Sequence, residues 1–280
     1  MNKTSICDSK FINLESTLDG GQAFRWHRNG DHYRGVIGNK VYIISNENNL
    51  IYLNSLNFRM NEKDLKKIKK YLGLDFNLEE FKNIYKNDDY IYKLINQNCG
   101  LRILKQDPWE TIVSFITSSV SNILKIKKNI NDLCIFNGKK IGDGKFDYVF
   151  PTDRELIEIG EKNLRKLGFG FRSPYLIDAA NKSINKEIST VKNNDSYDNK
   201  LNELIKIKGV GKKVADCIMT YGFERRDAFP VDRWVRRGLI NNLGYNNKLS
   251  NDKLSVLAQK KYKNDSAYIQ QYIFYGEKTS

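Results

Sequence analysis

Two adjacent lysines, Lys212 and Lys213, directly follow a Gly-Val-Gly turn, and an amine in such a position can do chemistry. A lysine amine becomes a nucleophile once it loses its proton, and desolvation, a neighbouring cation and a helix N-terminus all favour that loss. On a helix, Lys212 is spaced to form an ion pair with Asp216 on a solvated face. Lys213 shares a less polar face with Cys217 and Tyr221, so we predict that Lys213 is the nucleophile. In the simpler alternative, both lysines only neutralise phosphate.

The turn before the lysines is a candidate phosphate site. An apolar helix is predicted to end near Gly209 and a second helix to start after Gly211, within a hairpin that spans residues 204–218. Glycines on both sides of Val210 allow a tight turn and the close approach of a ligand. The N–H groups that open the second helix would then face an anion such as a DNA phosphate. A plain pair of helices would use the same glycines, so the turn alone leaves both interpretations open.

A surplus of positive charge favours a polyanionic partner. The 280 residues include 47 Lys and Arg against 33 Asp and Glu, a formal net charge of +14. A basic, aromatic-rich chain commonly binds nucleic acid, although a generally lysine-rich composition would give the same charge. A hydrophobic content of 40% is too high for a disordered chain. Because the chain has no uncharged apolar run of about 20 residues and no apolar stretch behind a basic start, we expect neither a membrane span nor a secretory signal.

The four cysteines stand far apart in the sequence. Because they form neither a CxxC pair nor a close cluster with a histidine, we expect no zinc site and no iron–sulfur cluster. In a chain of this size, such cysteines are typical of reduced, mostly buried thiols in a cytoplasmic protein. They are Cys7, Cys99, Cys134 and Cys217.

The hydrophobic pattern predicts an α+β fold with two domains. An N-terminal antiparallel β-sheet domain with helices would span residues 1–100, and a larger all-helical domain would span residues 101–280. Short runs rich in Val, Ile and Tyr between Gly and Asn predict the strands, and the apolar spacing becomes helical after Asp107-Pro108. The predicted strands are residues 31–37, 40–45 and 50–53. Helix starts are predicted near Asn61, Pro108 and Thr152, a helical stretch over residues 164–184 with a break at 168–170, a loop at 138–145 and a polar linker at 193–199.

A second motif lies downstream of the hairpin. Asp232 follows Pro230-Val231 and precedes a predicted helix, where its simplest role is that of a cap. With the hairpin, this segment resembles the helix-hairpin-helix DNA glycosylases that have a Gly-Pro-Asp-type loop, and the chain is most similar to the 8-oxoguanine DNA glycosylase/lyases of that superfamily. The resemblance extends over most of the chain, in six segments that keep the family's order. They are Gly-Gln-Ala-Phe-Arg-Trp at residues 21–26, Gln-Asp-Pro at 106–108, Lys-Leu-Gly-Phe-Gly-Phe-Arg at 166–172, the hairpin, Pro-Val-Asp at 230–232, and Gln270 with Phe274.

At the reacting sugar, the resemblance implies covalent catalysis. Lys213 would displace the base at C1′ and form a Schiff base, which permits β-elimination. Asp232 would stabilise the positive charge on the sugar and help to manage the proton of the lysine, while still capping its helix. The resemblance requires no organic cofactor, and it implies only a cation held by the backbone carbonyls of Ile205, Ile207 and Val210.

At the damaged base, the resemblance implies four recognition residues. The carbonyl of Gly21 would accept the N7–H that 8-oxoguanine has and guanine lacks. Gln270 would bond the Watson–Crick edge of the flipped base. Phe274 would stack on one face of the base and Cys217 would lie on the other. Without the resemblance, the apolar helix around Phe274 would be interpreted as plain core.

The sequence departs from the family's pattern where the protein would fill the gap left by the flipped base. Val120 stands where relatives usually have an Asn, and Lys125 where many have an Arg that reads the orphaned cytosine. Phe171 replaces the usual Tyr wedge, and Arg172 keeps the neighbouring Arg. We therefore expect lesion recognition without a strict preference for cytosine. The predicted DNA contacts are these four residues together with Gly209, Val210, Gly211 and Lys212.

The sequence thus predicts a bifunctional DNA repair glycosylase and AP lyase that acts on 8-oxoguanine. Its partner would be double-stranded DNA that contains oxidised guanine, and the protein would be a cytoplasmic monomer, associated with the nucleoid in a bacterium. One alternative is an alkylpurine glycosylase of the same superfamily, which keeps the aspartate and lacks the lysine. The other is a non-catalytic helix-hairpin-helix module that binds DNA, which leaves the pairing of Lys213 with Asp232 unexplained.

Overall fold

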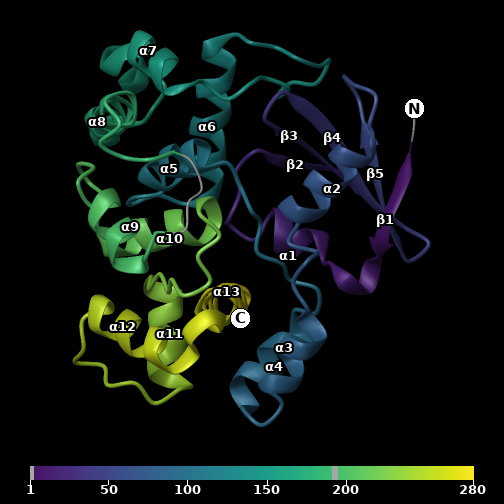
Figure 1. Ribbon diagram of the computed structural model, residues 1–280, viewed down its shortest axis with the longest axis vertical. Helices are drawn as coiled ribbons and strands as arrows, with labels where there is room; N and C mark the ends of the chain where they lie inside the picture. The colour runs from purple at the N-terminus through teal and green to yellow at the C-terminus, as the bar shows by residue number, and fades with distance from the viewer. Residues whose placement is uncertain (1–2, 191–194) are drawn as a thin grey trace.

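The computed structural model describes residues 3–190 and 195–280, and the chain begins with a five-stranded antiparallel sheet (Figure 1). The strand order is β1-β5-β4-β3-β2, so β2 to β5 form a meander and β1 pairs with β5. The predicted strands correspond to β3, β4 and β5. The strands are β1 (Thr4–Asp8), β2 (Trp26–Asn29), β3 (His32–Ile37), β4 (Lys40–Glu47) and β5 (Leu50–Ser55).

The hairpin turns of the sheet use residues that tolerate a left-handed backbone. Gly38, with φ 60°, connects β3 to β4, and Asn48 and Asn49, with φ 50° and 63°, connect β4 to β5. These turns set a register in which Ile44 lies opposite Leu53. Both side chains are fully buried, because alternate residues of each strand face the core. The sheet therefore has one well-packed apolar face.

Most of the remaining described residues are helical, and the predicted helix starts are confirmed by their caps. Asn61 with Asp64 and Thr152 with Glu155 form capping boxes, and Asp107 caps the helix that begins at Pro108. The helices are α1 (Leu14–Leu18), α2 (Glu62–Tyr71), α3 (Leu78–Ile84), α4 (Asp89–Gln97), α5 (Pro108–Thr117), α6 (Ile123–Asn137), α7 (Asp153–Lys166), α8 (Ser173–Ile184), α9 (Tyr197–Leu204), α10 (Lys212–Gly222), α11 (Arg233–Asn241), α12 (Asn251–Tyr262) and α13 (Ser266–Thr279), with short 3-10 turns η1 (Ser9–Phe11), η2 (Gly170–Arg172) and η3 (Lys263–Asp265).

Two sequence expectations need correction. The predicted polar linker at residues 193–199 overlaps α9, which begins at Tyr197 after the side chain of Ser196 caps it, while residues 193 and 194 lie outside the described residues. Helices α3 and α4 follow the sheet and were not predicted. The predicted break at residues 168–170 is confirmed, because Gly168 has φ 89° and separates α7 from η2.

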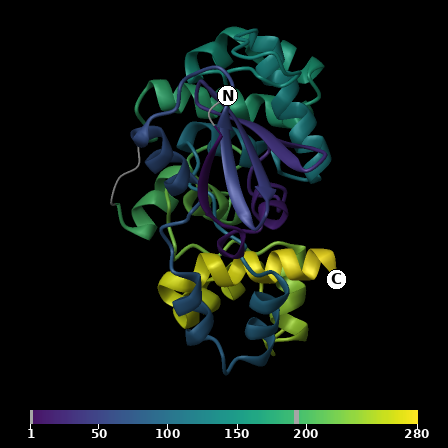
Figure 2. The ribbon, with the colours of Figure 1, turned by 90° about the vertical axis from the view of Figure 1, so that its right-hand side faces the viewer.

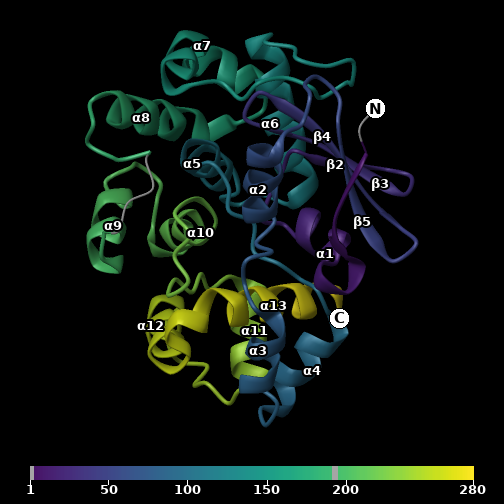
Figure 3. The same ribbon diagram turned by 45° about the vertical axis from the view of Figure 1, so that its right-hand side comes forward.

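Helix α10 lies between α5 and the C-terminal helices (Figure 3). Helix α11 packs on α13, and α13 in turn packs on α4, which lies beneath it in Figure 2. Gly276 permits this last contact, since a Cβ at that position would collide with the side chain of Leu94. The expected domain division at residue 100 stays a prediction, and α4 precedes it while packing on the C-terminal helix. Among the described helices, none combines the length and apolarity needed to cross a bilayer.

Candidate active site

The Gly-Val-Gly turn joins α9 to α10, and its two glycines are present for different physical reasons. Gly209 has φ 77°, and a Cβ there would collide with the ring of Tyr175. Gly211 is exposed at the N-cap of α10, and no described atom lies within 4 Å of the position that its Cβ would take. Because no side chain caps α10, its first N–H groups are open to a ligand. The fold therefore requires Gly209. The lack of a side chain at Gly211 instead leaves the surface at the N-terminus of α10 open to a ligand.

Lys212 forms the predicted ion pair with Asp216, but the pair is not on a solvated face. The ammonium nitrogen lies 2.8 Å from the carboxylate, whose side chain is completely buried. Tyr197 and Ser255 also donate hydrogen bonds to Asp216. Burial raises the pKa of Asp216 and the charge of Lys212 opposes this shift. Lys212 is thus engaged inside the protein, which corrects the expectation of a solvated face, while its predicted contact with phosphate stays a prediction.

Lys213 lies beside Cys217, as its spacing predicted. The half-buried lysine lies one helical turn before buried Cys217 on α10. Burial raises the pKa of Cys217 to about 11, the charge of Lys213 opposes this shift, and the charges of Asp216 and Asp232 add to it. The thiol is therefore neutral at ordinary pH.

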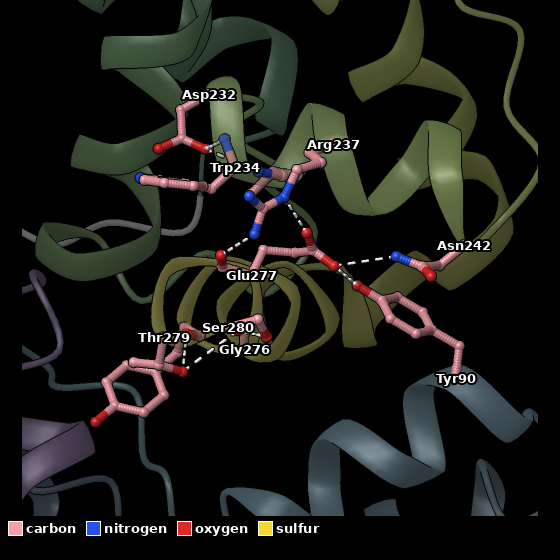
Figure 4. A network of polar contacts seen from close by, with 11 residues as sticks. Tyr90, Asp232, Trp234, Arg237, Asn242, Gly276, Glu277, Thr279 and Ser280 are labelled. Atoms are coloured by element: carbon pink, nitrogen blue, oxygen red, sulfur yellow. Dashed lines mark hydrogen bonds and ion pairs between the residues drawn. The ribbon is translucent and has the colours of Figure 1, made fainter.

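Asp232 is the N-cap of α11, which confirms its simplest predicted role. Its Oδ1 accepts hydrogen bonds of 2.9 Å from the backbone N–H groups of Trp234 and Val235 (Figure 4). Within the described residues, Oδ2 accepts no hydrogen bond. The cap consequently fixes the carboxylate and leaves one oxygen available.

Gly21, Phe274 and Gln270 come together from distant parts of the chain. Gly21 has φ 87°, and a Cβ at this position would lie 3.4 Å from the ring of Phe274 and 2.9 Å from Ile123. Gln270 lies one helical turn before Phe274 on α13 and is 4% exposed. Its Oε1 is buried, and no described group donates a hydrogen bond to it. A buried amide oxygen without a partner is costly, so it marks a place for a ligand donor.

The helix that carries Gln270 is tied to α10. The hydroxyl of Tyr221 on α10 donates a 2.6 Å hydrogen bond to Oε1 of Gln271 on α13. The nucleophile candidate and the candidate base-recognition helix are thus held in one packed unit. The spacing of Tyr221 with Lys213 predicts that they share a face of one helix, but nothing in the sequence pairs Tyr221 with Gln271.

Two of the residues that are predicted to fill the gap, Val120 and Phe171, have apolar side chains at the protein surface. Val120 is 90% exposed and Phe171 is 48% exposed. Val120 has φ 49°, an uncommon and strained conformation for a β-branched residue. Lys125 is exposed on the first turn of α6. These positions suit contact with an external partner.

Arg172, in contrast, does not lie at this surface. It is 4% exposed, and its guanidinium donates hydrogen bonds to the backbone carbonyls of Ser119 and Val120, the latter at 2.8 Å. The same group lies over the ring of Phe171, 4.4 Å from its centroid. In this structure Arg172 holds the segment that carries Val120, and its contact with an orphaned base stays a prediction.

A network behind Asp232 was not predicted. The guanidinium groups of Arg233 and Arg237 each lie over the ring of Trp234, 4.5 and 4.7 Å from its centroid. Arg237 also pairs with buried Glu277 on α13, which accepts a 2.6 Å hydrogen bond from the hydroxyl of Tyr90 (Figure 4). The Arg and Trp residues directly after Asp232 are the sequence feature that could have predicted this network.

The carbonyls proposed for a cation are arranged around the turn. The carbonyl of Ile207 accepts the N–H of Val210 at 3.1 Å, whereas no described backbone N–H donates to those of Ile205 and Val210. Free carbonyl oxygens suit a hard cation. No group of three or more His, Cys, Asp or Glu that could hold a metal occurs in the described part of the chain.

Known proteins are similar to this chain over most of its length. Residues 5–112 match the family described as 8-oxoguanine DNA glycosylase, N-terminal domain. The N-glycosylase/DNA lyase of Saccharomyces cerevisiae is 33% identical over 263 residues, 85% of this chain and 68% of that protein. A probable N-glycosylase/DNA lyase of Methanothermobacter thermautotrophicus is 29% identical over 231 residues, 74% of this chain and 73% of that protein.

A solved structure extends the similarity to the whole fold. The 8-oxoguanine glycosylase/lyase of Clostridium acetobutylicum, in complex with double-stranded DNA that contains cytosine opposite 8-oxoguanine, superposes with a TM-score of 0.88. It is 32% identical, and the match covers 100% of this chain and 98% of that one.

Proposed function

The chain belongs to the 8-oxoguanine DNA glycosylase/lyase family, and from this premise we propose that it excises 8-oxoguanine from double-stranded DNA and then cleaves the strand. One observation carries the proposal to particular residues. Lys213 lies one helical turn before buried Cys217 on α10, and Asp232 caps the next helix with one carboxylate oxygen that no described group bonds. A nucleophilic amine, a carboxylate and a buried apolar wall are what displacement of a base from a sugar requires.

In the proposed reaction, Lys213 is the nucleophile. The lone pair of its unprotonated amine attacks C1′, and the bond from C1′ to the base breaks with its electron pair leaving on the base, which takes up a proton. Oδ2 of Asp232 would face the positive charge that develops on the sugar. After the amine loses a proton, the nitrogen lone pair forms a C1′=N bond, the C1′–O4′ bond breaks and O4′ takes up a proton, which leaves a Schiff base. Loss of a proton from C2′ then expels the 3′ phosphate with its electron pair.

Base recognition is proposed for Gly21, Gln270 and Phe274, of which Gly21 lies next to Phe274 and Gln270 lies one helical turn before it. The carbonyl of Gly21 would accept the N7–H of 8-oxoguanine and repel the bare acceptor at N7 of guanine. The unpartnered Oε1 of Gln270 would accept from the donors on the Watson–Crick edge. Phe274 would stack on one face of the flipped base, opposite Cys217. The buried position of Gln270 supports this role, since water is kept from competing for its oxygen.

Phosphate binding is proposed for the open N-terminus of α10. The exposed Gly211 leaves room for a DNA backbone against uncapped N–H groups. A cation on the carbonyls of Ile205, Ile207 and Val210 would add positive charge next to that phosphate. No step of the reaction depends on this cation.

Two alternatives make different demands on Lys213. An alkylpurine glycosylase would use water as its nucleophile and would need no amine beside Asp232. A non-catalytic module would use the turn before α10 and would leave the buried Gln270 without a purpose. The position of Lys213 against Cys217, rather than in the exposed turn, favours the glycosylase/lyase.

A single experiment separates these functions. The protein is incubated with a duplex that carries one 8-oxoguanine, with and without borohydride. We expect base release, a cleaved strand and, with borohydride, a stable covalent adduct. Base release without an adduct would indicate a water nucleophile. Binding without base release would leave only the DNA-binding module.

A further inference from the structure

The hydroxyl of Tyr221 connects the helix of Lys213 to the helix of Gln270. It donates to Oε1 of Gln271 at 2.6 Å, and both side chains are buried. Gln271 is the chain neighbour of Gln270, and Tyr221 lies two turns beyond Lys213 on the same face of α10. Because helices are stiff, this one bond between the two helices restrains the rotation of α13 relative to α10.

The backbone of Tyr221 makes a second connection, toward Gly21. Its carbonyl accepts the N–H of Gln106 at 2.8 Å. The side chain of Gln106 donates to the carbonyl of Gln22 at 2.6 Å, and Gln22 follows Gly21 directly. Tyr221 is therefore connected to the neighbours of both residues that are proposed to read the base.

Packing keeps the ring of Tyr221 in place. It stacks on Phe115 of α5, with centroids 5.2 Å apart and an angle of 12° between the planes. Burial raises the pKa of the phenol well above its ordinary value, and the charges of Cys217 and Asp232 act in the same direction. The hydroxyl thus stays a neutral donor, aimed at Gln271.

We propose that Tyr221 is a positioning residue that holds the base-reading groups, Gly21 and Gln270, in register with Lys213. The inference rests on the proposed function and deepens it. A damaged base must be read at its edges and attacked at its sugar in one geometry, so excision needs this register. Cleavage at a sugar that already lacks its base needs Lys213 and no base-reading group.

The test compares the two reactions in the full-length protein. Tyr221→Phe removes only the hydroxyl and keeps the stacked ring. We expect single-turnover excision of 8-oxoguanine to slow about tenfold, as one lost neutral hydrogen bond allows. The rate of cleavage of a duplex with a preformed abasic site should stay within about twofold of the rate of the unmodified protein, because this reaction needs no base-reading group. A twofold change in rate corresponds to less free energy than one typical hydrogen bond. Tyr85→Phe is the matched control, because it removes a 3.1 Å bond to Asp265 at the start of α13 without involving α10.

A second variant makes the test independent of one substitution. Gln271→Leu should reproduce the selective loss of excision, and the double variant should lose no more than either single variant, because both groups serve one bond. Excision and abasic-site cleavage that fall in parallel, or an excision rate that does not change, would overturn the inference. If the unmodified protein neither excises 8-oxoguanine nor cleaves the abasic site, the proposed function itself fails, whereas selective results in the variants concern only Tyr221.

Discussion

Lys212 and Asp216 form an ion pair of 2.8 Å in which the carboxylate is completely buried. The neighbouring Lys213 instead lies against the neutral thiol of Cys217. Two lysines that are adjacent in the sequence are thus turned to different surroundings by the 100° step of a helix. One holds α10 in place, and the other is left for chemistry.

Lys213→Gln should abolish both base release and the borohydride adduct, because it removes the amine that is proposed to attack C1′. DNA binding should persist, since phosphate contacts come largely from backbone amides and other cations. Excision and trapping assays, with binding measured by gel shift, check this. An adduct that survives in Lys213→Gln would refute the assignment.

Lys212→Gln provides the contrasting variant of the same turn. It leaves the charge of Asp216 buried and unpaired, so the free energy of unfolding should fall by about 3 kcal/mol. The protein that remains folded should still form the adduct. Chemical denaturation and trapping on the same preparation measure the two effects, and Lys212→Gln with Asp216→Asn should recover part of the stability.

Changing each glycine of the turn to alanine should affect a different property, stability for Gly209 and DNA binding for Gly211. Gly209→Ala forces a Cβ into the ring of Tyr175 at φ 77°, so stability should fall by about 1–3 kcal/mol. Gly211→Ala meets no described atom within 4 Å and should leave stability nearly unchanged while weakening DNA binding. Melting temperatures and binding constants test the pair. Equal affinity for DNA in Gly211→Ala and the unmodified protein would contradict the phosphate site.

Asp232→Asn should separate the cap from the chemistry. The amide oxygen can still accept from Trp234 and Val235, so the loss of stability should be below the roughly 1 kcal/mol of a lost cap. Turnover should fall by orders of magnitude, because the neutral amide cannot stabilise positive charge on the sugar. Single-turnover rates and thermal unfolding provide both values. Near-normal turnover would reduce Asp232 to a helix cap.

Discrimination between cytosine and adenine opposite the lesion should be weak. A bidentate Arg contact to a base is worth about 1–3 kcal/mol, but Lys125 offers only a point charge and Val120 cannot donate a hydrogen bond. Arg172 is turned inward to the carbonyl of Val120. We expect a preference of about tenfold or less, from single-turnover excision on four duplexes that differ in the opposite base. A cytosine preference above about a hundredfold would mean that other residues read this base.

Acid should weaken the contact between the sheet and α6. His27 on β2 stacks on Phe146 and hydrogen-bonds Asn131 of α6, and burial lowers its pKa from 6.5 to about 4. Between these values the unfolded chain binds a proton that the folded protein excludes. Stability from this residue is therefore complete above pH 6.5 and is lost as the pH falls toward 4, by about 2–3 kcal/mol.

The measurement is urea unfolding at a series of pH values, compared with His27→Phe. This variant has no group that titrates at the position, so its stability should depend less steeply on pH between 6.5 and 4. Identical slopes in both proteins would show that His27 does not contribute.

The sequence alone was sufficient for features that depend on near neighbours. The caps at Asn61 and Asp232, the turn at Gly209 and the spacing of Lys213 with Cys217 all follow from contacts within a few residues. Local backbone geometry limits such contacts to a few arrangements, so the residue types predict them. The short strands β1 and β2 and the helices α3 and α4 lacked signals of this strength.

Only the tertiary structure decided which residues pack against each face of a helix. The spacing of Lys212 and Asp216 predicted their pairing, but Tyr197 and Ser255, from other helices, bury the pair. In the same way, Arg172 turns inward because the carbonyl of Val120 lies next to it, and Tyr221 bonds Gln271 only because the fold brings this part of α13 to the end of α10. Helical spacing sets which residues share a face, whereas the partner of that face comes from a segment far away in the chain, and its position depends on the packing of the whole core.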